Sequence, residues 1–468
     1  MTSSVRAVLP WRMPQRPGSS SSETSPALVT PGLPRRIGLG TATSVVVANM
    51  IGTGIFTTTG LMLARLESGW LVLLCWILGG LVAIGGALCY AELATMMPQA
   101  GGEYVYLREI YGPLAGFLSG WVSFFVGFSA PIAATSVAIA TYLSAAGALP
   151  DSWLAVHGTA VGIVLALTIV HHRGLRLGAR VQNLLTGSKL LLLLGLVLLG
   201  FTSGGGSWRF LESGSDFWAG GRWGQTGLAL LWVMFAYSGW NGSAYLAEEI
   251  KRPERTLPRS LLSGTVAVMA AYLAVNMLFF FAAPPEDLKG VVAIGDAAAR
   301  SLFGPGAAKG LSILISVALL SSISAYVLTG PRVYYAMARD GLFFRMAARV
   351  HPRFETPGPS ILLQGVCAAL MVLTGSFEQL LTYIGFALGI FPWLAVAGLL
   401  RLRWREPARS RPYRVWGYPY VQILYLLASA LILGVALVNR PGPSLLALLT
   451  VAAGAAAYGL MARHRPRS

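Results

Sequence analysis

Long apolar stretches alternate with short polar connections along most of the chain. Residues 1–36 differ, because they are rich in Ser, Pro and Arg and lack apolar periodicity, as a disordered tail does. Twelve apolar stretches follow, at about 39–65, 69–97, 112–146, 153–171, 181–201, 224–250, 259–283, 306–337, 358–376, 378–400, 418–439 and 443–462. Each is long and apolar enough to span a bilayer. The pattern predicts an all-α polytopic membrane protein with twelve transmembrane helices over residues 37–463.

Two of these stretches are interrupted near their centres by glycine and polar residues. The first break is Asn49-Met50-Ile51-Gly52-Thr53-Gly54-Ile55-Phe56, and the second is Tyr237-Ser238-Gly239-Trp240-Asn241-Gly242. Such residues weaken a helix where hydrocarbon supplies no replacement hydrogen bonds, so each break must face protein, water or a ligand. Paired breaks in corresponding halves point to a substrate site near the membrane midplane. The alternative is that the glycines only allow helices to pack closely.

The basic residues predict the orientation of the chain. The N-terminal tail and alternate connections hold 27 of the 35 Lys and Arg residues, whereas the other connections hold 7. By the positive-inside rule, both termini are cytoplasmic and the multi-pass protein lies in the cytoplasmic membrane. This topology accounts for the formal net charge of +17, so we expect no nucleic-acid partner.

The sequence offers no pattern for enzyme chemistry. Cys75, Cys89 and Cys367 lie in apolar stretches, without a disulfide framework or metal-ligand spacing. There is no phosphate-binding glycine loop, no His cluster with zinc spacing and no pair of carboxylates deep in a helix. We therefore expect neither an enzyme nor a cofactor.

The two breaks could bind the charged groups of an amino acid. The start of a half-helix presents free amides and partial positive charge to a carboxylate, and the end of a half-helix presents carbonyls to an ammonium group. We expect the substrate carboxylate at the amides of Thr53, Gly54 and Ile55. We expect the ammonium group at the carbonyls of Ile51, Phe235, Ala236 and Ser238.

Several motifs, in order along the chain, resemble those of one transporter superfamily. They are Ile51–Phe56; Tyr90-Ala91-Glu92-Leu93 and Pro98–Tyr104; Phe235–Asn241, Glu248–Pro253 and Thr256–Pro258; Ala338–Gly341, His351-Pro352 and Thr356-Pro357; and Arg411–Arg414 with Gly417–Pro419. Together they resemble the amino acid–polyamine–organocation superfamily, with bacterial permeases similar to L-type amino acid transporters as the nearest group. The resemblance covers the whole chain after the tail.

This resemblance implies the leucine-transporter fold. Two inverted repeats of five helices would occupy about 37–201 and 224–400, with the first and sixth helices broken, and two extra helices would occupy about 418–462. It also implies that Phe235 forms an aromatic lid over the substrate. The alternative for Phe235 is an ordinary core- or lipid-facing aromatic residue.

Lys189 lies inside the fifth stretch, where a cation is costly unless it is paired, solvated or able to snorkel to the interface. In similar transporters of the superfamily, a fifth-helix lysine replaces a sodium ion. The resemblance implies that Lys189 rests against the first break and against eighth-helix hydroxyls, with Ser321 and Ser322 as candidates and Ser324 nearby. Sodium would then not be required, which leaves proton symport or substrate exchange.

These observations predict an amino acid permease that works by alternating access in the lipid bilayer. L-type transporters with a heavy glycoprotein subunit carry a cysteine between the third and fourth helices, and the connection at 147–152 has none, so we expect no disulfide-linked partner.

Ser238 stands where L-type transporters have glycine, which leaves the size of the amino acid substrate open. The alternatives are an amine or polyamine transporter of the same superfamily, and a channel or a non-transporting amino acid sensor.

Overall fold

The computed structural model describes residues 33–203, 205–212, 223–291, 294–374 and 377–463. Residues 1–32, most of the predicted tail, lie outside this range. The described segments are helical and contain no strand, and a single isolated bridge pairs Ile37 with Ile250. The prediction of an all-α polytopic membrane protein is confirmed at this level.

The helices follow the predicted stretches but are divided more finely. They are α1 (Leu39–Met50), η1 (Gly54–Phe56), α2 (Thr58–Leu66), α3 (Gly69–Met96), α4 (Glu103–Tyr111), α5 (Pro113–Val122), η2 (Ser123–Ser129), α6 (Ala130–Ala145), α7 (Trp153–His172), α8 (Leu175–Thr202), α9 (Arg209–Glu212), α10 (Trp223–Ala236), η3 (Gly242–Glu249), α11 (Pro253–Ala282), α12 (Pro285–Leu288), α13 (Ile294–Phe303), α14 (Pro305–Arg339), η4 (Arg345–Ala348), α15 (Gly358–Thr374), α16 (Phe377–Arg405), α17 (Tyr420–Asn439) and α18 (Pro441–Arg463).

Nine helical segments in the described part of the chain are long and apolar enough to cross a membrane. They are α3, α5 to α6 through the π-helical η2, α7, α8, α11, α14, most of α16, α17 and α18. Three shorter apolar helices are Leu39–Met50, Gln225–Ala236 and Gly358–Leu373. Two of these three precede the predicted breaks, so a break rather than a lack of apolar sequence shortens them.

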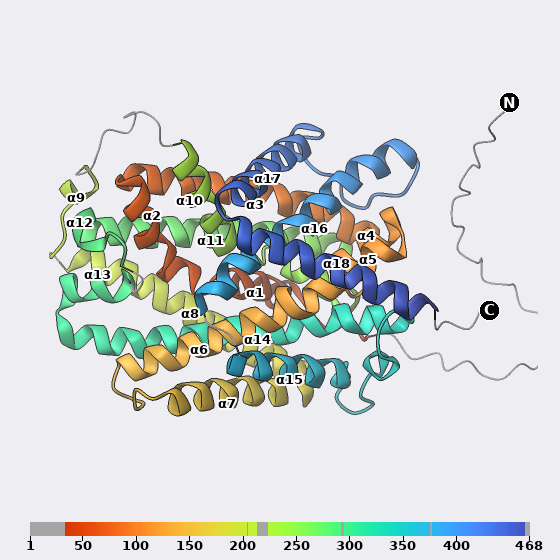
Figure 1. Ribbon diagram of the computed structural model, residues 1–468, viewed down its shortest axis with the longest axis horizontal. Coiled ribbons are helices and arrows are strands. Elements are labelled where there is room, and N and C mark those ends of the chain that lie inside the picture. The colour runs from red at the N-terminus through yellow and green to blue at the C-terminus, as the bar shows by residue number, and fades with distance from the viewer. Residues whose placement is uncertain (1–32, 204, 213–222, 292–293, 375–376, 464–468) are drawn as a thin grey trace, which may run out of the picture. The chain divides into compact units, whose positions relative to one another are not determined.

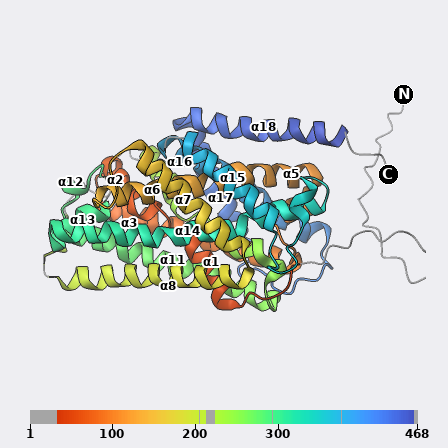
Figure 2. The same ribbon diagram turned by 90° about the horizontal axis from the view of Figure 1, so that it is seen from below.

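The helix α1 lies among α8, α11 and α14 (Figure 1), and it packs against all three. The helices α7 and α15 run side by side in both views, and α18 lies at one edge against α5 and α16 (Figure 2). Large apolar side chains of outer helices are exposed, including Leu191 of α8 at 71% and Leu449 of α18 at 64%. Apolar helices with exposed apolar faces suit a lipid solvent.

Residues 33–36, which the sequence analysis assigned to the tail, contact the helical body. The Leu33 amide donates to Glu248 at 3.0 Å, and Arg36 pairs with Glu355. The Ile37 amide donates to the Glu249 carbonyl, and the Ile37 carbonyl accepts from Lys251. These bonds tie the approach to α1 to the segment that follows the second break.

Candidate functional site

The first break separates α1 from α2. The helix α1 ends at Met50, Ile51 is extended with φ −73° and ψ 92°, and the short 3₁₀ helix η1 begins at Gly54. Among the described residues, the amides of Thr53, Gly54 and Ile55 donate to no hydrogen-bond acceptor. Three consecutive unpaired amides at the start of a half-helix form a local centre of positive potential.

The second break lies between α10 and η3. The helix α10 ends at Ala236, and the chain turns through Gly239, whose φ of +94° is strained for any residue with a Cβ atom. A 3₁₀ helix rather than an α-helix continues from Gly242 to Glu249. Both predicted breaks are therefore present as real interruptions of the helices.

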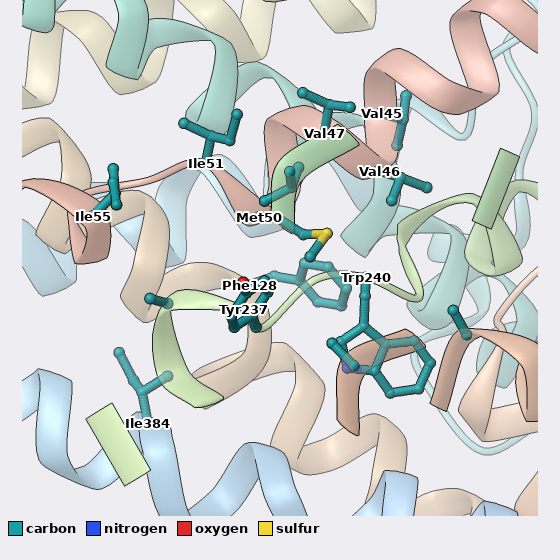
Figure 3. Close-up of a cluster of buried hydrophobic side chains, with 14 of the residues drawn as sticks. Val45, Val46, Val47, Met50, Ile51, Ile55, Phe128, Tyr237, Trp240 and Ile384 are labelled. Atoms are coloured by element: carbon teal, nitrogen blue, oxygen red, sulfur yellow. The ribbon is translucent and has the colours of Figure 1, made fainter. Parts of the chain in front are cut away.

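The two breaks touch each other, and glycine makes the contact possible. A Cβ atom added at Gly54 would lie 2.7 Å from the Ala236 Cβ, and one added at Gly239 would lie 2.8 Å from the Asn49 backbone. Figure 3 shows Met50 and Ile51 of the first break beside Tyr237 and Trp240 of the second. These glycines therefore allow close packing, and they also lie at true helix breaks. The two explanations apply at the same time.

Tyr272 of α11 connects the ends of the two helices. Its hydroxyl lies 2.6 Å from the Met50 carbonyl, the last residue of α1, and 2.8 Å from the Ala236 carbonyl, the last residue of α10. Tyr272 is completely buried. Both helix ends would otherwise expose carbonyls that hydrocarbon cannot satisfy.

A cavity of about 30 Å³, room for roughly two water molecules, lies between the breaks. Of the predicted site residues, Thr53, Gly54, Phe235, Ala236 and Ser238 line it. Its other lining residues are Met50, Gly52, Pro131, Ala134, Thr135, Tyr326, Ile384 and Leu388. Together, all the lining residues come from the first, third, sixth, eighth and tenth predicted stretches.

The side chains of Ile51 and Ile55 do not line this cavity. Both are fully buried, and Figure 3 shows them at the two ends of the extended segment. Their predicted roles involve only the backbone. For Ile51 that backbone carbonyl is already occupied, as described below.

A larger cavity of about 100 Å³ adjoins the first one. The two share Phe235, Ser238, Tyr326 and Leu388. The larger cavity also reaches Glu103 of α4, Asn49 of α1 and Tyr425 of α17. Ser238 and Phe235 therefore stand between a small cavity at the breaks and a larger one with a carboxyl group in its wall.

Lys189 lies near the middle of α8 and is only 1% exposed. Its Nζ donates to the Ile51 carbonyl and, at 2.9 Å, to the Ser322 hydroxyl. The Ser322 hydroxyl in turn donates to the Ile51 carbonyl at 2.7 Å. Among the described residues no carboxylate pairs with Lys189, so a carbonyl and a hydroxyl, the ligand types of an alkali cation, surround its ammonium group.

These contacts change the set of carbonyls that a substrate could use. The Ile51 carbonyl accepts from both Lys189 and Ser322, which uses its two lone pairs. The Ala236 carbonyl lies against Tyr272, and the Phe235 carbonyl accepts from the Ser238 amide at 3.0 Å. Of the four predicted carbonyls, only that of Ser238 accepts no hydrogen bond from the described residues.

The remaining predicted hydroxyls have other partners. Ser321 donates to the Ala318 carbonyl on its own helix at 2.8 Å and does not contact Lys189. Ser324 lies 2.8 Å from Nε2 of the buried His171. The structure thus brings together Lys189, Ser322 and the first break, and it leaves Ser321 outside that group.

Buried and half-buried ion pairs surround the segment after the second break. Arg332 of α14 and Glu249 of η3, both with fully buried side chains, form a bidentate pair with distances of 2.7 and 3.0 Å. Glu248 pairs with Arg339 at 3.2 Å. Arg332 was not predicted as a functional residue. An arginine directly after Gly330 and Pro331 inside an apolar stretch is nevertheless a sequence signal that indicates a buried, paired cation.

Comparison with known proteins agrees with this architecture. The family model described as amino acid permease matches residues 37–457. The large neutral amino acids transporter small subunit 2 of Homo sapiens is 31% identical over 97% of this chain and 86% of its own length. The Asc-type amino acid transporter 1 of Homo sapiens is 30% identical over 93% of this chain and 84% of its own length.

A bacterial relative is similar over nearly its full length. The serine/threonine exchanger SteT of Bacillus subtilis (strain 168) is 32% identical over 93% of this chain and 98% of its own length. A family match over nearly the whole structured chain, together with relatives at this level of identity, leaves one assignment. The chain belongs to the amino acid permease family, within the amino acid–polyamine–organocation superfamily.

Proposed function

We propose that this protein is a secondary active permease that moves amino acids across the cytoplasmic membrane by alternating access, without sodium. The observation that carries the proposal is the pair of touching helix breaks, whose three unpaired amides lie next to a cavity. The names of the relatives, which describe transporters and an exchanger of amino acids, support the substrate class.

The binding mode follows from the backbone groups that remain unpaired. The substrate carboxylate would accept hydrogen bonds from the amides of Thr53, Gly54 and Ile55, where the half-helix potential is positive. The ammonium group would donate to the carbonyl of Ser238. Phe235 lines both cavities and would cover the bound substrate.

Lys189 would serve as a built-in cation. Its ammonium group holds the Ile51 carbonyl and the Ser322 hydroxyl together, as a bound metal ion would do. A sodium ion would therefore have no place to bind at this position. Proton symport and substrate exchange remain as the two coupling modes.

The proposal includes the topology. Twelve crossings, two inverted repeats of five helices with two extra helices at the C-terminal end, and cytoplasmic termini agree with the helix order and with the distribution of basic residues. Residues 1–36 would form a cytoplasmic tail, and no disulfide-linked heavy subunit is required.

Uptake into proteoliposomes tests the proposal. The panel contains labelled L-serine, L-threonine, L-leucine and their decarboxylated amines, with and without sodium, a proton gradient and internal amino acid. We expect saturable amino acid uptake that internal substrate stimulates and sodium does not change. Preference for the amines would overturn the carboxylate site, and unsaturable flux would indicate a channel. Binding without flux would indicate a sensor.

A further inference from the structure

Glu103 is a buried carboxyl group in the wall of the larger cavity. It is the first residue of α4, a short helix between the candidate spans α3 and α5, and it is only 5% exposed. In the described part of the chain, no Lys, Arg or His forms an ion pair with it. It differs in this respect from Glu92, Glu248 and Glu249, which all pair with arginines.

The carboxyl group holds the second break to α4. The Asn241 side-chain amide donates to Oε1 at 2.5 Å, and the Tyr245 hydroxyl donates to the same oxygen at 3.2 Å. Asn241 belongs to the break itself, and Tyr245 lies in η3 directly after it. A charged carboxylate accepts both hydrogen bonds well, whereas a protonated carboxyl has less acceptor capacity and carries a donor of its own.

The groups around Glu103 are polar but not positively charged. The titratable side chains that face it are Tyr90 of α3, Tyr106 of α4, Tyr245 of η3 and Tyr425 of α17. Asn49 of α1 lines the same cavity, is 2% exposed, and has a side-chain amide that bonds to none of the described residues. Its partners among the described residues are tyrosines and amides, so no nearby cation offsets a negative charge on the carboxyl group.

Burial raises the pKa of the Glu103 carboxyl from its usual 4.5 to about 7, and the hydrogen bonds from Tyr245 and Asn241 partly oppose this rise. If the cavity opened to water during transport, the desolvation that causes the rise would disappear and the pKa would return toward its usual value. The affinity of Glu103 for a proton therefore depends on the conformation of the transporter.

We propose that Glu103 is a proton-binding residue of the transport cycle, which takes up a proton when the segment 241–245 closes over it and releases the proton when the cavity hydrates. This inference rests on the proposed function as a permease. It gives that function a site for proton coupling that is separate from Lys189, which bonds to Ile51 of the first break.

The direction of the pH effect follows from the two pKa values. Below the usual value of 4.5 both conformations are protonated, and above about 7 neither is. Between these limits, closing over Glu103 takes up one proton, so the closed conformation loses stability relative to the open one as the pH rises through this window. Above about 7 the free-energy difference between the two conformations no longer changes with pH, because neither conformation then binds the proton.

The test compares Glu103→Gln with the wild type in proteoliposomes that hold equal pH on both sides. The initial rate of L-threonine and L-leucine exchange is measured across about two pH units on either side of 7, and trapped pyranine reports proton movement during net uptake into liposomes that hold no internal amino acid. We expect the wild-type rate to change several-fold with a midpoint near 7 and proton movement to accompany substrate. Glutamine cannot titrate, so both effects should disappear in Glu103→Gln and persist in Glu103→Asp.

The control is Glu109→Gln, which removes a half-buried carboxylate six residues further along α4 and should retain the wild-type profile. If Glu103→Gln keeps the midpoint and the proton movement, or if the wild type shows neither while exchanging substrate, the inference is wrong. Should Glu103→Gln not transport, binding of the same amino acids to the purified variant decides, and wild-type pH dependence of that binding would overturn the inference. A wild type without any exchange would instead contradict the proposed function.

Discussion

At the scale of single residues, Lys189 is the one buried cation of the described helix α8, and its Nζ donates to the Ile51 carbonyl and the Ser322 hydroxyl. Replacing it with alanine leaves the Ile51 carbonyl and the Ser322 hydroxyl short of a donor, at a cost of about 1–3 kcal/mol. We expect Lys189→Ala to lower amino acid exchange about tenfold or more, since about 1.4 kcal/mol corresponds to a factor of ten. Proteoliposome exchange at saturating substrate measures the loss.

A matched control for this substitution lies on α14. Lys309 is exposed near the start of that helix, and Lys309→Ala should exchange like the wild type. Exchange by Lys189→Ala at the wild-type rate would remove the built-in cation from the proposal.

The pair of Arg332 and Glu249 makes a prediction about stability. Both side chains are fully buried, so Arg332→Ala leaves an uncompensated carboxylate, which costs about 3–5 kcal/mol. We expect a marked drop in the thermal unfolding temperature of the detergent-purified protein. The double variant Arg332→Ala with Glu249→Ala removes the stranded charge and should recover part of the drop, and a double variant as unstable as the single one would show that packing rather than charge is responsible.

At the scale of elements, the glycines of the breaks set how closely α1 and α10 approach. Gly239→Ala adds a Cβ atom at φ +94° and 2.8 Å from the Asn49 backbone, so it brings both dihedral strain and a clash. We expect it to lower both the thermal stability and the exchange rate. Gly147→Ala has φ +78° but nothing within 4 Å, so it isolates the dihedral cost and should be the milder variant in both assays.

Much of the element scale could be predicted from sequence, because apolar length and glycine placement are written in the residues themselves. The two breaks and the helices around them follow from that pattern. The role of Tyr272 could not be predicted, because its partners are backbone carbonyls of two distant segments, and a tyrosine in an apolar stretch carries no sign of them. The Ile51 carbonyl was expected to be free for substrate because its two donors, Lys189 and Ser322, also lie far away in the sequence.

The π-helical segment Ser123–Ser129 was also not predicted. Its seven residues are apolar or small and read as ordinary helix. The segment packs against α14, α15 and α16, and such contacts between distant segments are information that local sequence does not contain. Glu103 was not predicted as a site residue, because its local sequence does not show that its carboxyl lines a cavity without an arginine partner among the described residues.

At the scale of the whole molecule, the distribution of basic residues predicts which loops face the cytoplasm. Asp151 lies before α7 and Ser410 lies between α16 and α17, and both are exposed. In intact cells, we expect a membrane-impermeant maleimide to label Asp151→Cys from outside and to label Ser410→Cys only after permeabilisation. The reverse pattern would invert the proposed topology. The native cysteines Cys75, Cys89 and Cys367 are not exposed and should contribute little background labelling.

The Tyr272 hydroxyl has a mechanical consequence for the whole molecule. One hydroxyl lies within hydrogen-bonding distance of the final carbonyl of α1 and the final carbonyl of α10, and its single hydrogen is shared between them, so sliding those two ends apart loses a buried contact. A rotation of α1 and α10 about Tyr272 would keep both carbonyls within reach of this hydroxyl, whereas a translation of either helix end would not.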